Sequence, residues 1–211
     1  MRPAEPGVAE SGAGARLPLA TQRLILRDFE PGDWQALFAS ESDPDTVRYL
    51  PREPFTEDSA RDYLRRGLED AAARPRRIYD LAVVLKSDGA VVGRCGLEVR
   101  DASLGEAVIW YVLDRRHRGQ GLMNEAAPRL LDFGFGELGL RRLVADIDPR
   151  NTASARLAEA VGMRREAHFL ENVIIKGELC GTLIYAMLRR EWEARRSSPS
   201  GGSPGEAGEG G

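Results

Sequence analysis

The order of apolar and polar residues along the middle of the chain predicts three consecutive β-strands. Runs rich in β-branched and aromatic residues, bounded by turn residues, are typical of strands. Such runs occupy residues 78–85, 91–99 and 106–113. The Asp88-Gly89 pair between the first two runs favours a tight hairpin, and residues 100–105 supply a second turn. We therefore expect these three strands to pair in antiparallel order.

Apolar residues at a helical period flank these strands on both sides. Pro31 suits the first turn of a helix, and Thr56 suits the N-cap of a second one. A third helix begins after Gly121 and stops at Gly139, and Asn151 caps a fourth. The residues expected to face the core from these helices are Trp34, Leu37 and Phe38, then Ala60, Tyr63, Leu64, Leu68 and Ala71, then Leu122, Ala126 and Leu130, and last Ala153, Leu157 and Val161.

Pro128 lies inside the third of these helices. A proline there removes the hydrogen bond to the carbonyl of Asn124, which costs about 3 kcal/mol where nothing compensates for it. We therefore expect this helix to kink at Pro128.

The remaining strands complete one sheet. Residues 21–28 predict an edge strand, residues 142–148 follow the third helix, and residues 163–172 and 183–189 predict a hairpin around Lys176-Gly177. A strand, a crossover helix and a strand in succession imply parallel or splayed neighbours. The expected fold is a mixed α/β single domain with a central, mostly antiparallel twisted sheet and about four helices.

A basic turn that contains glycine joins the strand at residues 106–113 to the third helix. It reads Arg115-Arg116-His117-Arg118-Gly119-Gln120-Gly121. The first N–H groups of a helix have no partner within it, and the helix dipole adds about half a positive charge there. Gly119 and Gly121 allow the backbone close to an anion, while Arg115, Arg116 and Arg118 add charge at its rim. The turn is predicted to bind phosphate.

Two other classes of phosphate-binding loop do not fit this turn. A Walker loop ends in Gly-Lys-Ser or Gly-Lys-Thr, and neither occurs in the chain. A dinucleotide-binding loop needs a third small residue where Asn124 stands. Considered by itself, the turn also fits a solvated surface loop whose arginines only cover the start of a helix.

Composition and charge limit the remaining possibilities. The chain has 211 residues, of which 42% are hydrophobic and 30% charged, as in one globular domain with a sizeable core. A net charge of −3 argues against a general nucleic-acid binder. No apolar run is long enough to cross a bilayer, and the first 15 residues lack the apolar core of a secretory signal. A cytoplasmic protein without membrane contact is expected.

The two ends differ in composition from the middle of the chain. Residues 1–16 and 197–211 are rich in Gly, Ala, Pro, Ser and Glu, so we expect them to be disordered tails around a domain at 17–196. Within that domain Cys95 and Cys180 lie far apart, with no metal-ligand spacing to any histidine. Neither a disulfide nor a metal site is therefore expected.

Several segments together resemble a known family. Arg116-x-x-Gly119-x-Gly121 after a strand resembles the acyl-CoA pyrophosphate loop of the GNAT superfamily of N-acetyltransferases. The similarity covers roughly residues 17–192. The further segments, in the order that the family requires, are residues 23–27 for the first strand, 151–154 with 161–163 for the last helix and the turn after it, and 175–178 with 185–188 for the final strands of the RimJ/RimL-type branch.

The resemblance implies a sheet that splays between its fourth and fifth strands, here residues 106–113 and 142–148. The pantetheine arm of acetyl-CoA would lie in that gap, and amides of the basic turn would hold the pyrophosphate. Acetyl-CoA is thus the implied co-substrate, without a metal. The residues implied to bind it are Tyr111, Val112, Leu113, Arg116, His117, Arg118, Gly119, Gln120, Gly121, Leu122, Met123, Asn151 and Ser154.

The same resemblance implies candidates for the chemistry. Ser154 stands where RimJ/RimL-type enzymes carry a serine that steadies the leaving thiolate, and Asn151 caps the same helix. The tyrosine that many superfamily members use is replaced by Ala158. Glu106 is the expected general base because it lies in the fourth strand, although the family's usual acid position holds Val108.

Other interpretations of these residues stay open. Glu98 and Glu171 are alternative bases, and each carboxylate fits a solvated strand end equally well. Ser154 also fits a helix-start residue that only bonds backbone. The residues expected to line the acceptor side are Tyr49, Phe55, Glu98 and Trp110, and for Tyr49 and Phe55 simple packing of the helix connection is the alternative.

The expected function is transfer of an acetyl group to a primary amine. An α-amino group with a pKa of about 7.7 to 8.0 is partly neutral near pH 7, whereas a lysine at about 10.4 asks more of a base. A protein N-terminal α-amine, of the ribosomal-protein type, is the expected acceptor, and a small amine such as an antibiotic is the alternative. A non-catalytic acyl-CoA-binding module is a second alternative, which Val108 and Ala158 favour. A monomer or a homodimer is expected.

Overall fold

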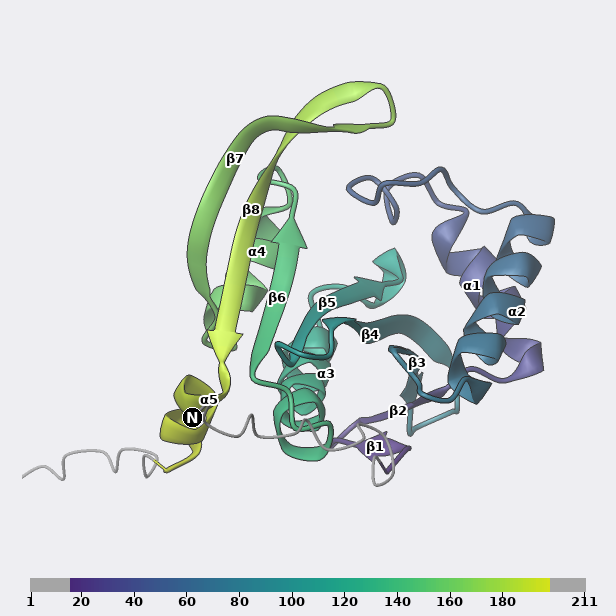
Figure 1. Cartoon of the computed structure of the whole chain (residues 1–211). Coiled ribbons are helices and arrows are strands. Elements are labelled where there is room, and N and C mark those ends of the chain that lie inside the picture. Colours follow the sequence, from purple (N-terminus) through teal and green to yellow (C-terminus); the bar gives the residue numbers. More distant parts are fainter. Residues whose placement is uncertain (1–15, 198–211) are drawn as a thin grey trace, which may run out of the picture.

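One eight-stranded sheet runs through the molecule in the order β1-β2-β3-β4-β5-β6-β8-β7 (Figure 1). The structure, a computed structural model, describes residues 16–197, so the tails expected at the two ends lie outside the described residues apart from Arg16 and Ser197. The strands are β1 (Leu19–Ala20), β2 (Leu24–Asp28), β3 (Ile78–Leu85), β4 (Val91–Asp101), β5 (Glu106–Leu113), β6 (Arg142–Ile147), β7 (Arg164–Ile175) and β8 (Glu178–Leu188).

Five α-helices accompany the sheet in the described part of the chain. The α-helices are α1 (Trp34–Glu41), α2 (Glu57–Ala72), α3 (Leu122–Asp132), α4 (Thr152–Ala160) and α5 (Arg189–Ser197). The shorter helical turns are the 3₁₀ helices η1 (Pro31–Asp33) and η2 (Arg115–His117) and the π-helix η3 (Phe133–Glu137).

All neighbouring strands are antiparallel except β5 and β6, which are parallel. The mixed α/β fold with a mostly antiparallel sheet is therefore confirmed. The hairpin turn between β3 and β4 is also where the sequence predicted it, with Gly89 at a φ of +74°. Such positive φ values suit glycine because it has no Cβ.

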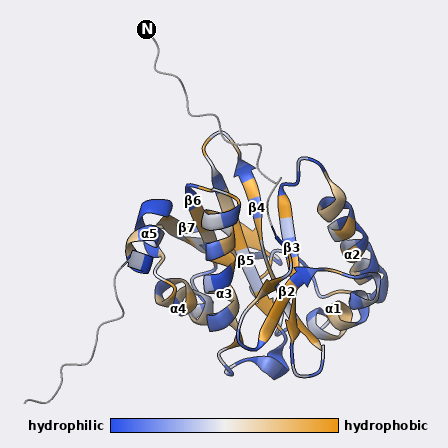
Figure 2. Cartoon of the chain, turned by 90° about the horizontal axis from the view of Figure 1, so that it is seen from below, coloured by the Kyte–Doolittle hydropathy of each residue, from blue (hydrophilic) through white to orange (hydrophobic). Residues whose placement is uncertain are grey.

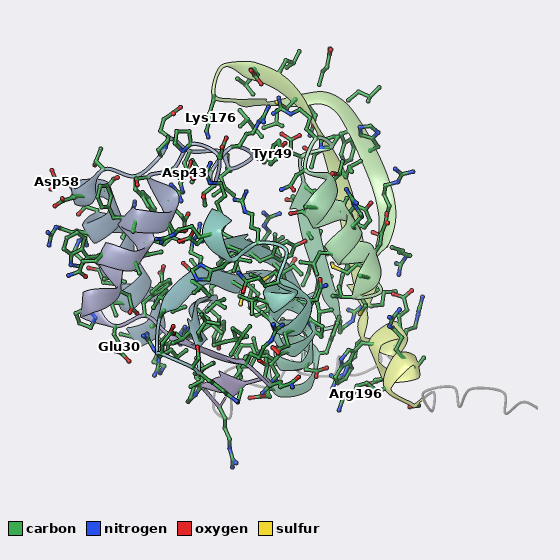
Figure 3. All side chains as sticks on the ribbon, turned by 180° about the vertical axis from the view of Figure 1, so that it is seen from behind. Glu30, Asp43, Tyr49, Asp58, Lys176 and Arg196 are labelled. Carbon is green, nitrogen blue, oxygen red and sulfur yellow. The ribbon has the colours of Figure 1, made fainter. Side chains whose placement is uncertain are left out.

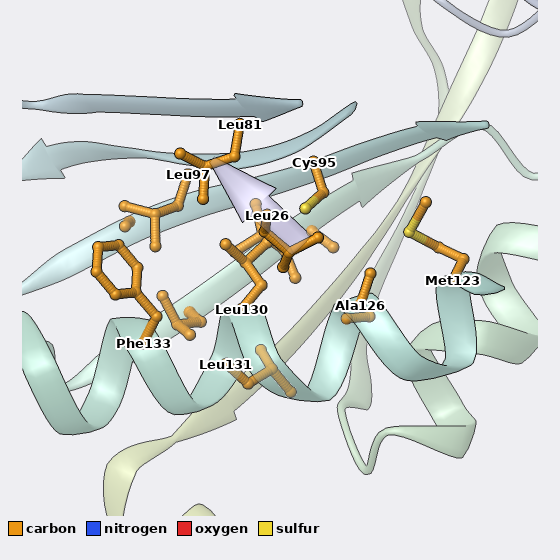
Figure 4. Close-up of a cluster of buried hydrophobic side chains, with 14 of the residues drawn as sticks. Leu26, Leu81, Cys95, Leu97, Met123, Ala126, Leu130, Leu131 and Phe133 are labelled. Carbon is orange, nitrogen blue, oxygen red and sulfur yellow. The ribbon is translucent and has the colours of Figure 1, made fainter. Parts of the chain in front are cut away.

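The helices cover the two faces of the sheet separately. α1 and α2 lie on one face, and α3, α4 and α5 lie on the other (Figure 2). The larger core lies between α3 and the sheet, where Leu26, Leu81 and Leu97 meet Leu130 and Phe133 (Figure 4). Burial of these side chains is the main stabilising term for the fold, at about 25 cal/mol for each Å² of apolar surface.

The helix α3 continues through Pro128 to Asp132 and then widens into the π-helical turn η3. The N–H of Leu138 donates to the carbonyl of Phe133 at 3.0 Å. Gly134 in this turn lies so close to β6 that an added Cβ would be 2.9 Å from Leu143 Cδ1. The helical irregularity therefore follows the predicted site at Pro128 by about one turn, at the place where the chain packs closely on the sheet.

Two local predictions are wrong, and one helix was not predicted. The strand expected at 21–28 begins only at Leu24, because Thr21 forms a turn in which its N–H donates to the Leu24 carbonyl at 3.0 Å. Ala153, expected in the buried stripe of α4, is exposed, and the buried residues of this helix are Leu157 and Ala158. The helix α5 was not predicted, since its only large apolar residue is Trp192.

The connection between α1 and α2 is anchored at both ends. The N–H of Phe55 donates to the carbonyl of Glu41 at 3.0 Å. At the start of α2, Thr56 and Ser59 form the capping box, with Thr56 as the predicted N-cap. Among the described residues, no helix combines the length and apolarity that crossing a bilayer requires.

The role of Thr56 as the N-cap of α2 can be tested by substitution. Replacing Thr56 by Ala should lower the free energy of unfolding by about 1 kcal/mol, because the N–H of Ser59 loses its side-chain acceptor. The Thr56→Asn variant keeps a capping oxygen and serves as the control. Urea unfolding followed by circular dichroism measures both, and equal loss in the two variants would contradict the capping role.

Candidate active site

The sheet has two parts, which we call half-sheets: one contains β1 to β5 and the other contains β6, β8 and β7. They meet along a short paired segment of β5 and β6, which we call the seam. These strands pair only over residues 106–108 of β5 and 142–144 of β6. Beyond that seam β5 stays with β4, and β6 stays with β8. In the described part of the chain, the β5 edge at 109–113 therefore has no strand partner on the β6 side. The predicted splay is confirmed, and Figure 1 shows β6, β7 and β8 rising away from β4 and β5.

A cavity of about 420 Å³ opens beside this free edge. It lies between the end of β5, the N-termini of α3 and α4, and the α1–α2 connection at residues 42–56, which we call the strap. Its size is typical of a small-ligand site. The residues that line it are Asp45, Thr46, Tyr49, Leu50, Tyr111, Val112, Leu113, Arg118, Gly119, Gly121, Leu122, Met123, Asn124, Asn151, Ala153, Ser154 and Leu157.

Most residues predicted to bind acetyl-CoA therefore surround one cavity. Arg116, His117 and Gln120 are the exceptions, since they do not line it. Sequence reasoning missed the contributions of Asp45, Thr46 and Leu50 from the strap. The only signal for them was their position in a connection between two helices, which does not say which cavity the connection covers.

The turn before α3 presents free backbone donors. Gly119 and Gly121 have φ values of +75° and +72°. In the described part of the chain, the N–H groups of residues 119–121 donate to no protein acceptor. Nothing lies within 4 Å of an added Cβ at Gly119, so the backbone there is open to a ligand. Together with the first turn of α3, these donors suit an anion such as a diphosphate.

Charged side chains hold this turn in place. Arg23 donates through Nη1 to the carbonyl of Gln120 at 3.0 Å, and it is paired with Glu125 in the first turn of α3. Arg116 Nη2 lies 2.6 Å from Asp114 Oδ2. Burial raises the pKa of Asp114, but the hydrogen bonds and charge of Arg116 outweigh burial, and the net pKa is lowered. Arg116 therefore supports the turn through an ion pair.

The strap is pinned across the cavity by cations from both half-sheets. Arg115 lies 3.3 Å from Asp43 and 3.0 Å from Asp45. Arg118 donates to the carbonyl of Thr46 at 3.5 Å. From the β7–β8 turn, Lys176 Nζ donates to the Val47 carbonyl at 2.7 Å. Figure 3 shows Asp43, Tyr49 and Lys176 close together at this edge of the molecule.

The rim charge predicted for the turn is thus largely engaged within the protein. Arg115 and Arg116 both pair with carboxylates, and Arg118 alone of the three arginines lines the cavity. Backbone donors and the α3 dipole therefore remain as the main anion-binding elements, with Arg118 as the nearby guanidinium.

The start of α4 brings Ser154 to the cavity. Asn151 Oδ1 accepts from the N–H of Ser154 at 3.1 Å, so Asn151 is the N-cap as predicted. Tyr111 Oη donates to the carbonyl of Ser154 at 3.0 Å. Burial raises the pKa of Tyr111 to about 12, so this phenol stays protonated near neutral pH. The Ser154 hydroxyl has no protein partner within the described residues and is free to bond a ligand.

The position expected for the base requires a correction. Glu106 lies at the closed end of the β5–β6 seam, and its Oε2 is 2.8 Å from Arg142 Nε. Arg142 is also paired with Glu166 at 2.6 Å. The carboxylate of Glu106 is therefore occupied by an ion pair and lies away from the cavity. Glu106, expected as the base because it lies in the fourth strand, is thus engaged by Arg142 and does not line the cavity.

Glu98 does not line the cavity either, but its carboxylate is unpaired within the described residues. It pairs in register with Val108, the last β5 residue in the seam. Directly paired residues project to the same face, with Cβ atoms about 5 Å apart. Glu98 is half-buried, and within the described chain its carboxylate makes no ion pair or hydrogen bond. A free carboxylate thus lies beside the splay point, next to the position where the family usually carries its acid.

The other residues predicted on the acceptor side lie in different surroundings. Tyr49 lines the cavity, and half-buried Trp110 lies on the same sheet face as Glu98. Phe55 is buried against Arg52 and Tyr63, with ring centroids of Phe55 and Tyr63 5.3 Å apart, so its role is packing. Glu171 is exposed in the irregular part of β7 and does not line the cavity.

No group of three or more His, Cys, Asp or Glu side chains suited to a metal occurs among the described residues. Cys95 and Cys180 are both buried free thiols. Burial raises the pKa of the Cys95 thiol, which makes it a poor nucleophile. Within the described residues, the site therefore offers backbone hydrogen bonding and the unpaired Ser154 hydroxyl, with the unpaired carboxylate of Glu98 beside the splay point.

Comparisons with known proteins agree with this geometry. Residues 23–164 match the family model described as the acetyltransferase (GNAT) domain. The chain is 34% identical over 179 residues to an uncharacterized N-acetyltransferase, p20, of Bacillus licheniformis, covering 82% of this chain and 97% of the relative. It is 22% identical over 177 residues to the spermidine N(1)-acetyltransferase of Escherichia coli, covering 82% and 90%.

Solved structures share the fold. A GNAT-family acetyltransferase from Bacillus anthracis superposes with a TM-score of 0.74 at 29% identity, covering 83% of this chain and all of that one. Mycobacterium smegmatis RimJ, solved in complex with CoA-disulfide, gives a TM-score of 0.71 at 23% identity, covering 83% and 87%. The chain therefore belongs to the GNAT acetyltransferase family, and it is an acetyl-CoA-dependent N-acetyltransferase.

Proposed function

We propose that this enzyme acetylates the α-amine at the N-terminus of a protein or peptide, by direct attack on acetyl-CoA in a ternary complex. The observation that carries the proposal is the unpaired carboxylate of Glu98 beside the splay point, as the described residues show it. One carboxylate is enough to accept the proton from one acceptor amine. The fold similarity to RimJ is consistent with this branch of the family.

Charges around the cleft argue against a polycation as acceptor. A polyamine favours clustered, unpaired acids. Here Asp43 and Asp45 pair with Arg115, and Asp148 pairs with Arg150 at 2.7 Å. The acidic groups of the rim are thus largely neutralised within the described chain. The similarity to a spermidine N(1)-acetyltransferase makes polyamines the second acceptor class to test.

The proposed reaction uses the two sides of the splayed sheet. The turn at 116–121 holds the diphosphate of acetyl-CoA, and pantetheine lies along the free edge of β5. Glu98 accepts the ammonium proton, and the neutral nitrogen attacks the thioester carbon. An N–H of the free β5 edge stabilises the oxyanion, which is worth about 3 kcal/mol for one such donor. The nitrogen then loses its second proton, the C–S bond breaks as the amide forms, and the departing thiolate, hydrogen-bonded by the Ser154 hydroxyl, takes up that proton through solvent.

An acceptor screen tests the function. Release of CoA from acetyl-CoA is measured with peptides beginning in Ser, Ala, Thr or Met, with an N-terminally blocked peptide that contains lysine, and with spermidine, spermine and an aminoglycoside. We expect turnover with free α-amines and little with the blocked peptide. Faster turnover of the polyamines or the aminoglycoside would contradict the proposed acceptor, and acetyl-CoA binding without any turnover would support a non-catalytic module.

The anion site is tested by a charge-matched pair at Gly119. Asp and Asn have nearly the same shape and strain the positive φ alike, so their difference reports charge at the site. Gly119→Asp should bind CoA at least about tenfold more weakly than Gly119→Asn, because a carboxylate there repels the diphosphate. Isothermal titration calorimetry with CoA measures both. Equal affinities would place the diphosphate elsewhere.

Ser154→Ala tests the thiolate interaction. Loss of one hydrogen bond to a developing charge should lower kcat about tenfold. The dissociation constant of CoA should change little, because the cap between Asn151 and the Ser154 N–H uses backbone and stays intact. Unchanged kcat in the variant would leave Ser154 with a structural role only.

Glu98→Gln tests the base, with Glu106→Gln as its control. We expect kcat to fall about a hundredfold in Glu98→Gln, since glutamine keeps the size but accepts no proton. Glu106→Gln should keep kcat within about threefold, because Glu106 is engaged by Arg142. Steady-state kinetics with the best acceptor of the screen compares them. The reverse ranking would return the role of base to Glu106.

A further inference from the structure

A buried charge network beneath α1 and α2 plays no part in the reaction described above. Its centre is formed by Glu41 at the end of α1, Asp80 in β3 and Arg94 in β4, which are 1%, 8% and 6% exposed. Buried charges are costly unless they are paired and hydrogen-bonded. Here Arg94 and Arg52 balance the two carboxylates.

Arg94 joins three elements of the fold. Its Nε lies 2.8 Å from Glu41 Oε1, and its Nη1 donates to Tyr63 Oη in α2 at 2.8 Å. The same Nη1 lies 3.5 Å from Asp80 Oδ1. Tyr63 Oη in turn donates to Asp80 Oδ2 at 2.5 Å. Because each polar group has a partner, the network holds α1 and α2 at a fixed position on β3 and β4.

One end of this network fixes Trp110. The indole Nε1 donates to Asp80 Oδ1 at 3.0 Å. The ring lies over Gly96, where an added Cβ would be only 2.6 Å from Trp110 Cζ2. Since Gly96 pairs with Trp110 and Glu98 pairs with Val108, this indole lies on the same sheet face as the proposed base. Trp110 is therefore a fixed wall of the proposed acceptor side.

The other end fixes the strap. Glu41 also pairs with Arg52 inside the strap, and its carbonyl accepts from the N–H of Phe55 at 3.0 Å. The guanidinium of Arg52 stacks on the Phe55 ring, 3.7 Å from its centroid. Glu41 thus holds the two ends of the strap together. Tyr49, within the strap, lines the acetyl-CoA cavity.

We propose that Glu41, Arg94 and Asp80 are positioning residues that couple the two substrate sites, by holding the strap over the acetyl-CoA cavity and Trp110 at the acceptor side from one rigid support. This proposal rests on the proposed function only for the identity of the acceptor side. The three residues touch neither substrate, so they act through the strap and through Trp110.

Two variants separate the ends of the network. Asp80→Asn should raise the KM for the best acceptor of the screen about tenfold and leave the dissociation constant of CoA within about twofold. Glu41→Gln should raise both constants about tenfold, because it releases the strap as well as Arg94. Trp34→Phe, which alters a tryptophan on α1 outside the network, is the control and should change neither. Circular dichroism confirms that each full-length variant is folded.

A double-mutant cycle tests the coupling itself. If Glu41 acts on the acceptor through Trp110, the double variant Glu41→Gln, Trp110→Phe will raise the acceptor KM by less than the product of the fold-changes in the two single variants. Multiplicative effects, or a Glu41→Gln variant that is folded and keeps both constants within about twofold, would overturn the proposal.

A readout without an acceptor keeps this proposal separate from the proposed function. A chain with Trp34→Phe and Trp192→Phe retains Trp110 as its single tryptophan. Adding Glu41→Gln should increase acrylamide quenching of Trp110 about twofold and weaken CoA binding. Unchanged quenching and CoA affinity would refute the coupling. Failure of every acceptor in the screen, with these two changes present, would refute only the proposed reaction.

Discussion

The active site depends on the shortness of the β5–β6 seam. Three residues of each strand pair, and the two half-sheets then separate. Because β4 satisfies the other edge of β5 and β8 satisfies the other edge of β6, the divergence leaves only two facing edges without partners. A backbone edge that lacks a strand partner favours an extended ligand that carries amides. Pantetheine has this chemistry, so the cavity beside β5 fits acetyl-CoA.

Charge is distributed around this opening in an economical way. The arginines near the turn mostly hold protein segments together, whereas backbone N–H groups at 119–121 remain available. Fixed backbone dipoles need no counter-ion and lose little side-chain entropy when a diphosphate binds. Arg115 and Lys176 instead attach the strap to the two half-sheets, and the strap closes the cavity. Backbone groups thus serve binding and Arg115 and Lys176 serve closure, whereas Arg118 lines the cavity and also donates to the strap at Thr46.

The sequence predicted the local elements and the turn before α3. It did not predict which residues distant in sequence pair with one another. The strands β3 and β5, the cap at Thr56 and the positive φ at Gly121 follow from local patterns and backbone chemistry. The pairing of Glu106 with Arg142 depends on register across the seam, which no local pattern encodes. The same applies to Glu98, whose place beside Val108 comes from the hairpin register of β4 and β5.

Other features were out of reach for a related reason. Ala153 is apolar and stands at a helical period with Leu157, yet it faces the cavity because the first turn of α4 lines the opening. Asp80 and Arg94 were single charges within apolar runs, and only the assembled fold shows that they meet Glu41 from α1. Charged residues inside predicted buried strands were the one available signal, since such charges need partners.

Hydrogen–deuterium exchange of the full-length protein with and without CoA tests whether the diphosphate and pantetheine of CoA bind at the turn before α3 and along the free edge of β5. We expect CoA to slow exchange of the amides at 109–113 and 119–124, because the free edge of β5 and the turn before α3 then gain acceptors. Amides at 106–108, already within the seam, should change little. Protection confined to other segments, under conditions where calorimetry shows CoA bound, would place CoA elsewhere on the protein.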